Sequence, residues 1–171
     1  MSSWFTTTNT LQHVSSVPEG VPADKVIEML QAHEFYLKCN PHMTMFEPVE
    51  TPQDPFPTIP EARQLTGTSE PDCYKVTDKV HTLPAGLWDS NVESRYEFIN
   101  IERGVFVRIR SPLNSMMETV WTARENEDGT IELVEDVLIT ASRVLVGTIT
   151  SMCEAGWSGI HQSMMAKLQG K

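Results

Sequence analysis

The sequence lacks the features that hold small secreted proteins together. It has three cysteines, Cys39, Cys73 and Cys153, which are too few and too widely spaced for a disulfide framework or a zinc site. Residues 1–10 carry neither the positive charge nor the apolar run of a secretory signal peptide. Reduced thiols without a leader segment predict a cytoplasmic protein.

Clustered positive charge is also missing. The 171 residues carry a net charge of -10, and lysine and arginine form no run. Nucleic acids and anionic membranes attract such runs, so we expect neither as a partner. No apolar stretch approaches the length of a membrane-spanning helix, so we expect no membrane insertion.

The motifs of nucleotide- and metal-dependent enzymes are absent. The chain contains no P-loop, no G-x-G-x-x-G, no G-x-S-x-G and no H-E-x-x-H. The histidines are dispersed and show no metal-ligand spacing within one element. They are His13, His33, His42, His81 and His161. We therefore expect no metal ion and no cofactor.

The chain has enough hydrophobic residues to form the core of one domain over residues 1–171. Hydrophobic residues make up 40% and charged residues 21%, as in ordinary globular proteins. A proline-rich stretch over about 42–72 leaves room only for a short strand at 44–50 and a helical turn at 61–65. Loops of this length are usually lids, binding loops or insertions, so we weigh a loop over a cavity mouth against a plain insertion.

Hydrophobic periodicity predicts the order of the remaining elements. A strand comes first, then a helix that begins near Pro22 and ends by Asn40, then antiparallel strands, then one long amphipathic helix. The predicted ranges are strands 11–17, 74–80, 94–102, 105–111, 116–125 and 130–140, a Pro/Gly-containing link at 84–91, and the closing helix 142–168.

The two hairpins allow predictions of register. A turn at 103–104 sets Glu97 opposite Arg110 as a surface ion pair, with Arg108 on the same outer face. The inverse orientation, with both arginines in a cavity, stays open. In the last hairpin, burial of the apolar face selects the pairing of Glu135 with Trp121, because a one-residue slip would exchange the two faces. Glu135 is therefore predicted to point inward.

This order of elements resembles the helix-grip fold of the START/polyketide-cyclase-like superfamily, which includes the Bet v 1-like plant proteins. The stretches that carry the resemblance are HVSSVPEGVPADKVIEML, ENEDGTIELVEDVLIT and IHQSMMAKL. The proline-rich stretch is similar to that of an uncharacterised fungal branch. The resemblance covers the whole chain and implies an α+β fold, with a curved antiparallel sheet wrapped around a long C-terminal helix and an apolar cavity between them.

Members of the superfamily bind lipids, sterols, hormones or polyketides, and some act as cyclases, dehydratases or isomerases. They share no catalytic residues, so the resemblance implies a small hydrophobic ligand but no particular reaction.

Three side chains are candidates for catalysis. Glu135 is the sharpest, because a carboxylate in an apolar cavity is suited to general acid–base work; the alternative is a carboxylate satisfied by a buried partner. Asp78 lies on the inner face of its strand and could pair with Glu135, or cap a local bend. His161 follows Glu154 and Trp157 along one flank of the closing helix and could contact a ligand; the alternative exposes it to solvent.

The expected cavity lining combines aromatic, flexible apolar and hydrogen-bonding side chains. Its members are Trp121, Tyr96, Phe98, Asn100, Met117, Met152, Trp157, Ile160 and Met164. Three helix glycines, Gly147, Gly156 and Gly159, suggest room for a ligand or a close approach to the sheet.

Two functions from different classes follow. One is a cofactor-free cyclase, pericyclase, isomerase or dehydratase that acts on a polyketide- or terpenoid-like intermediate. The other is a non-catalytic carrier of a lipid or hydrophobic metabolite; a partner-binding module without a cavity is a third, weaker reading. The number of convergent polar groups in the pocket discriminates between the first two. The sequence does not predict the oligomeric state, and a homodimer is one option.

Overall fold

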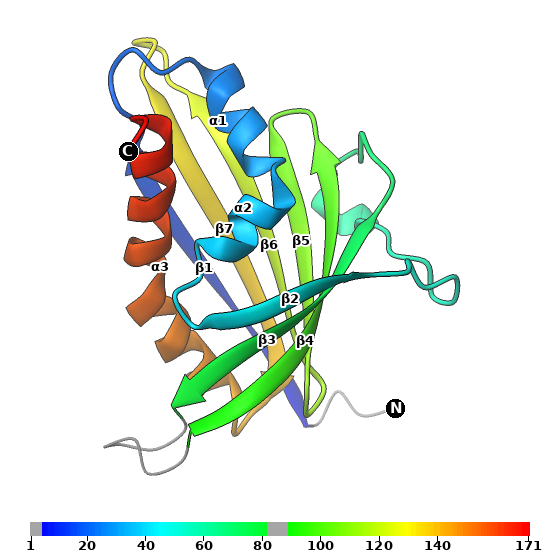
Figure 1. Cartoon of the computed structure of the whole chain (residues 1–171). Coiled ribbons are helices and arrows are strands. Elements are labelled where there is room, and N and C mark those ends of the chain that lie inside the picture. Colours follow the sequence, from blue (N-terminus) through cyan, green and yellow to red (C-terminus); the bar gives the residue numbers. More distant parts are fainter. Residues whose placement is uncertain (1–4, 82–88) are drawn as a thin grey trace.

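The sheet pairs the first strand of the chain with the last. A computed structural model describes residues 5–81 and 89–171. In this part of the chain, seven antiparallel strands form one curved sheet in the order β1-β7-β6-β5-β4-β3-β2 (Figure 1). The strands are β1 (Thr6–Ser16), β2 (Met43–Val49), β3 (Asp72–His81), β4 (Asp89–Ile101), β5 (Gly104–Ser111), β6 (Ser115–Glu125) and β7 (Ile131–Ser142). The predicted link at 84–91 lies mostly outside the described residues.

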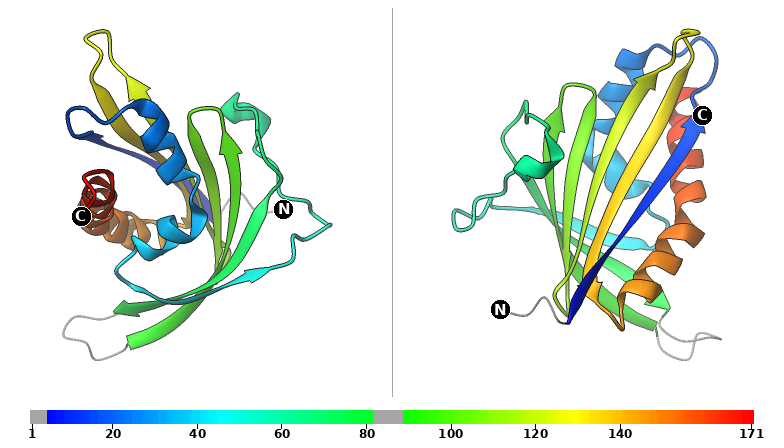
Figure 2. Two further views of the ribbon diagram at one scale, coloured as in Figure 1. Left: turned by 45° about the horizontal axis from the view of Figure 1, so that its top comes forward. Right: turned by 180° about the vertical axis from the view of Figure 1, so that it is seen from behind.

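The helices cover the concave face of this sheet. The long helix α3 (Val146–Leu168) packs against β1 and β7, while α1 (Ala23–Leu30) and α2 (His33–Lys38) fill the concavity beside it (Figures 1 and 2). This is the predicted helix-grip fold. The closing helix begins later than predicted, at Val146, and Val144 before it is 86% exposed instead of buried.

The first helical region is broken, whereas the sequence predicts one helix up to Asn40. The break falls at Gln31 and Ala32, where Ala32 leaves helical geometry (φ -84, ψ 81). The Gln31 side-chain amide donates hydrogen bonds to the carbonyls of Ile101 and Gly104, both at 3.1 Å. This tertiary anchor on the β4–β5 turn fixes the break and redirects α2 across the sheet.

The register of the last hairpin is as predicted, and that of the β4–β5 hairpin is shifted by two residues. Trp121 pairs with Glu135. Glu97 pairs with Arg108 and not with Arg110, because Gly104 belongs to β5 and not to the turn. A Cβ on Gly104 would lie 1.8 Å from the carbonyl oxygen of Trp121, so this position in the strand requires glycine. A two-residue shift preserves the faces, so Arg108 and Arg110 lie on the outer face.

Beyond β2, the proline-rich segment packs on the convex face of the sheet, away from the cavity, whereas His42 at its start lines the cavity (Figure 2). Its predicted strand and helical turn appear as β2 and the 3₁₀ turn Glu61–Arg63. Ile59 and Leu65 pack against a separate apolar cluster, which consists of Ile99, Ile101, Phe106 and Val120. The hypothesis of a loop over the cavity mouth is therefore wrong, because these side chains anchor the segment to the opposite face.

Beneath this segment lies a buried ion-pair network. Glu118 is 4% exposed and accepts hydrogen bonds from Arg108 Nε and Nη2 at 3.0 and 2.7 Å. Glu97 is 1% exposed and accepts from Arg95 and Arg110 at 2.8–3.0 Å. The predicted Glu97–Arg110 ion pair thus exists, but only partly as a surface pair, because its carboxylate is buried while the Arg110 side chain is 38% exposed.

Replacing Glu118 by alanine should lower the free energy of unfolding by about 3 kcal/mol, because the buried Arg108 would lose its two shortest hydrogen bonds and keep only the longer contact with Glu97 at 3.4 Å. Urea unfolding measures this loss. The control is Glu132→Ala, which breaks an exposed pair with Arg124 and should cost less than about 1 kcal/mol. Equal losses in the two variants would contradict a buried network.

Candidate functional site

A cavity of about 400 Å³ lies between α3, α2 and the concave face of the sheet. Most of its lining is apolar, and the apolar members include Val76, Val80, Val92, Ile109, Met116, Leu145, Ile149 and Ile160. Leu113 and Met152 line it and are 74% and 45% exposed, which marks its open end between the β5–β6 turn and the first half of α3. A cavity of this size and polarity is typical of small-molecule sites.

Glu135 forms the polar centre of the cavity wall, as the register predicts. It is 8% exposed, and its Oε2 lies 2.8 Å from Nδ1 of His13, its cross-strand neighbour on β1. The His13 ring stacks on Trp157 of α3 with centroids 4.7 Å apart and planes at 4°. Its Nε2 lies 3.4 Å from the half-exposed Glu154. A line of polar groups therefore joins the cavity wall to the surface.

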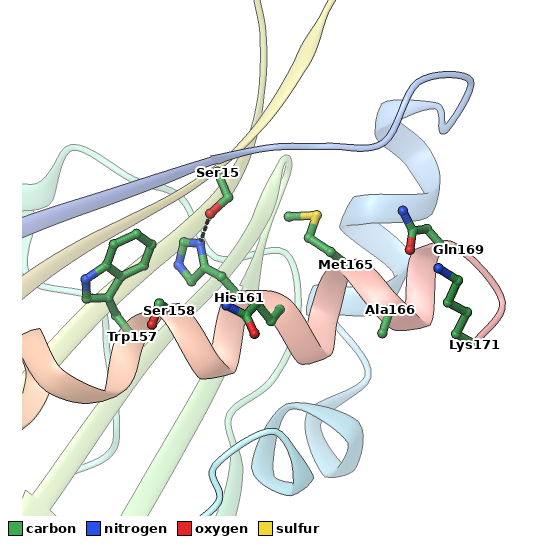
Figure 3. Close-up of a pocket in the computed structure, with 9 residues that line it drawn as sticks. Ser15, Trp157, Ser158, His161, Met165, Ala166, Gln169 and Lys171 are labelled. Carbon is green, nitrogen blue, oxygen red and sulfur yellow. Dashed lines mark hydrogen bonds between the residues drawn. The ribbon is translucent and has the colours of Figure 1, made fainter.

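His161 approaches the same carboxylate oxygen from α3. It is 2% exposed, so the alternative that exposes it to solvent is wrong. Its Nε2 lies 3.6 Å from Glu135 Oε2, and its Nδ1 lies 2.7 Å from Ser15 Oγ (Figure 3). Ser15 and His161 line a second, more open pocket of about 450 Å³ between β1 and α3. Glu135 therefore lies in the wall between the two pockets.

Hydrogen-bond logic assigns the protons in this group. A bare nitrogen 2.8 Å from a carboxylate oxygen is unfavourable, so Nδ1 of His13 carries a hydrogen that it donates to Glu135. Nε2 of His161 lies 3.6 Å from the same oxygen, beyond hydrogen-bond distance, and the attraction between an N–H group and a carboxylate places its hydrogen on this side. Ser15 then donates to Nδ1 of His161. Glu135 Oε2 thus accepts one imidazole hydrogen bond, from His13, and faces a second N–H group from His161, which leaves Oε1 for a ligand.

Tyr36 adds a hydroxyl to the same end of the cavity. Trp121 donates from Nε1 to the Tyr36 oxygen at 3.0 Å, so the tyrosine retains its own proton for another acceptor. Burial raises the pKa of Tyr36 and keeps it protonated at neutral pH. The sequence analysis does not identify three residues of this site, Tyr36, His13 and Ser15. Their partners are remote in the chain and no motif links them.

Asp78 points inward as predicted but does not form a pair with Glu135. Both line the cavity, but they lie on β3 and β7, which three other strands separate. Asp78 Oδ1 accepts a hydrogen bond from the Asn40 amide at 3.1 Å. Burial raises the pKa of Asp78, and nearby His42 lowers it by a smaller amount.

Six of the nine expected ligand-contacting residues line the cavity. They are Trp121, Tyr96, Met117, Met152, Trp157 and Ile160. The lining does not include the other three. Phe98 is fully buried and stacks on His33 at 4.5 Å, Asn100 Oδ1 lies 2.8 Å from His33 Nε2, and Met164 is 1% exposed in the core. Strand alternation correctly predicts the inward direction of Phe98 and Asn100, but α1 and α2 occupy the space in front of them.

The helix glycines are not required by packing. A Cβ at Gly147, Gly156 or Gly159 would meet nothing within 4 Å, so a close approach to the sheet is excluded. Only Gly156 of the three lines the cavity.

The described residues provide no cluster of three or more histidine, cysteine, aspartate or glutamate side chains placed to hold a metal ion. None of the described helices is long and apolar enough to cross a membrane.

A family model described as a domain of unknown function, DUF7053, matches residues 6–170. The chain belongs to this family. A search of curated proteins returns no significant match for the DUF7053 chain.

Solved structures share the fold of the DUF7053 chain. The allergen Ara h 8.0201 has a TM-score of 0.56 at 15% identity, with 96% of this chain and 100% of that chain covered. The Zhui aromatase/cyclase from Streptomyces sp. R1128 has a TM-score of 0.62 at 14% identity, with 95% and 94% covered. The di-domain ARO/CYC StfQ from the steffimycin pathway has a TM-score of 0.60 at 10% identity, with 95% and 52% covered. At these identities the matches show the Bet v 1-like helix-grip fold alone; a fungal source stays an expectation.

Replacing Asp78 by asparagine should stabilise the protein at pH 7. Because burial raises the pKa of Asp78, its carboxyl group binds a proton more tightly in the folded state than in the unfolded state. Its contribution to the free energy of unfolding is therefore greatest at low pH and is lost as the pH rises through the folded-state pKa. The variant should therefore melt at a higher temperature than the parent at pH 7. The difference should vanish below about pH 3.5, where both states of the parent are protonated.

The control for this prediction is Asp136→Asn, which makes the same change in net charge on the outer face and can keep the contact with Gln12. A stabilisation of equal size in the control would show that bulk charge, and not burial of Asp78, is responsible.

Proposed function

We propose that this DUF7053 protein binds a hydrophobic small molecule in the cavity and acts on it as a cofactor-free acid–base enzyme of the cyclase, isomerase or dehydratase type. The observation that carries the proposal is Glu135, held by His13 and His161 at the wall of an apolar cavity. Convergent polar groups around one carboxylate are what a catalyst needs and a carrier does not.

The geometry supports a proton transfer at Glu135. Oε1 accepts a proton from an acidic C–H next to a carbonyl, and the electron pair of that bond moves to the carbonyl oxygen. The Tyr36 hydroxyl donates a hydrogen bond to the oxygen on which negative charge develops. The resulting enolate attacks an electrophilic carbon of the same substrate, or takes the proton back at another position. His13 and Glu154 offer a path for proton exchange with solvent.

The substrate class follows from the lining and the fold. Flexible and aromatic apolar side chains suit a polyketide- or terpenoid-like intermediate, and the cavity would hold it in a reactive conformer. Two of the structural neighbours are named as aromatase/cyclases, which supports this class at the level of the fold only.

A non-catalytic carrier is the second candidate. The exposed apolar residues Leu113 and Met152 at the open end favour it, because they ease the entry of a hydrophobic ligand. In that case, the His13–Glu135–His161 group would only fasten β1 and α3 to β7. The presence of the cavity argues against the third function, a partner-binding module that has no cavity.

Replacing Glu135 by glutamine should remove the catalysed proton transfer while ligand binding remains. A direct assay is deuterium incorporation at the carbon next to the carbonyl of 1-tetralone in D₂O, followed by NMR. We expect the catalysed exchange to fall by about 10²-fold or more. The matched control is Glu127→Gln in the exposed β6–β7 turn, which should leave exchange unchanged.

Exchange in the glutamine variant at the parent rate would remove Glu135 from the mechanism. Binding of the ketone without catalysed exchange by the parent protein would favour the carrier.

A further inference from the structure

The charged side chains of the cavity are all acidic or histidine. Two carboxylates, Glu135 and Asp78, line it together with His13 and His42. Lysine and arginine do not occur among the described lining residues. An acidic ligand would therefore lose its hydration without gaining a cationic partner, which is costly in an apolar space. The cavity disfavours fatty acids and other carboxylates.

The negative charge of Asp78 is balanced differently from that of two other buried carboxylates of this chain. Glu97 and Glu118 on the outer face contact arginines at 2.7–3.0 Å. Among the described residues, Asp78 accepts a hydrogen bond from the neutral amide of Asn40 at 3.1 Å, and the exposed His42 acts on it only from outside hydrogen-bond distance. A half-buried carboxylate that lacks a close cation favours a ligand that supplies one.

The surroundings of Asp78 suit an ammonium group. Tyr96 lines the cavity beside Asp78 and Asn40, and aromatic rings attract cations. Ser94 and Ser111, whose hydroxyls lie 2.7 Å apart, line the same region and can accept further hydrogen bonds. The valines at 76, 80 and 92 provide an apolar wall next to these groups.

We infer that the cavity takes a hydrophobic amine, whose protonated nitrogen lies against Asp78 and whose apolar body extends toward Glu135. The inference deepens the proposed function and rests on it for the cavity being the ligand site. Asp78 and Glu135 are four strand spacings apart, or about 19 Å along the curved wall and less in a straight line. A polycyclic amine would thus place its nitrogen at one end and its reacting carbon at the other.

Three probes with one apolar body test the inference: 2-(1-naphthyl)ethylamine, 2-(1-naphthyl)ethanol and 1-naphthylacetic acid. Their Kd values are measured by calorimetry at pH 7 with the full chain. We expect the amine to bind about 10-fold tighter than the alcohol, and the acid to bind weakest. Asp78→Asn should remove the advantage of the amine and leave the alcohol unchanged. Asp136→Asn, with the same change in net charge outside the cavity, should preserve the ranking.

Three results would overturn the inference: an acid that binds as tightly as the amine, an amine without advantage over the alcohol, or equal effects of the two asparagine variants. Deuterium exchange separates this outcome from the proposed function. If the three probes do not bind in the expected order but deuterium exchange depends on Glu135, only the inference of an amine ligand is rejected. If the probes bind in the expected order but no exchange is catalysed, only the proposed catalysis is rejected, and an amine-binding carrier remains.

Discussion

The pairing of β6 with β7 is the constraint on which the site depends. It sets Glu135 opposite Trp121 on the concave face, and a slip of one residue would turn the carboxylate outward. Because β1 closes the sheet against β7, His13 becomes the direct neighbour of Glu135. The helix α3 then lies over both strands and brings His161 to the same oxygen. The β6–β7 register thus sets the position of Glu135, around which His13, His161 and one wall of the cavity are arranged.

The chain stabilises buried carboxylates in two different ways. On the convex face, Glu97 and Glu118 meet arginines, which stay charged at any physiological pH and make the pairing permanent. On the concave face, Glu135 meets two histidines, whose ring nitrogens lie 2.8 and 3.6 Å from one of its oxygens. The first arrangement joins neighbouring strands of the sheet, and Arg63 of the proline-rich segment lies 3.6 Å from Glu118 in the same network. The second keeps a proton available beside an apolar space, which is the physical basis of the proposed chemistry.

Local patterns in the sequence predict the fold and the direction of single side chains, and they fail where contacts are remote. Alternation along the strands places Glu135 and Asp78 inward, and the element order predicts the helix grip. The His13–Glu135 contact joins residues 122 positions apart, so no local pattern indicates it. Tyr36 reaches the cavity only because Gln31 breaks the helix against the β4–β5 turn. The role of the proline-rich segment depends on where it folds back, which its composition does not specify.

The central claim is that Glu135 accepts a hydrogen bond from Nδ1 of His13, while the N–H group of His161 Nε2 faces the same oxygen from 3.6 Å. Long-range ¹H–¹⁵N spectra of histidine-labelled protein measure this directly, because protonated and bare imidazole nitrogens have well separated ¹⁵N shifts. The account predicts a proton on Nδ1 of His13 and on Nε2 of His161, with both signals displaced in the Glu135→Gln variant. Averaged shifts like those of histidine in water, or the opposite tautomers unaffected by that substitution, would contradict it.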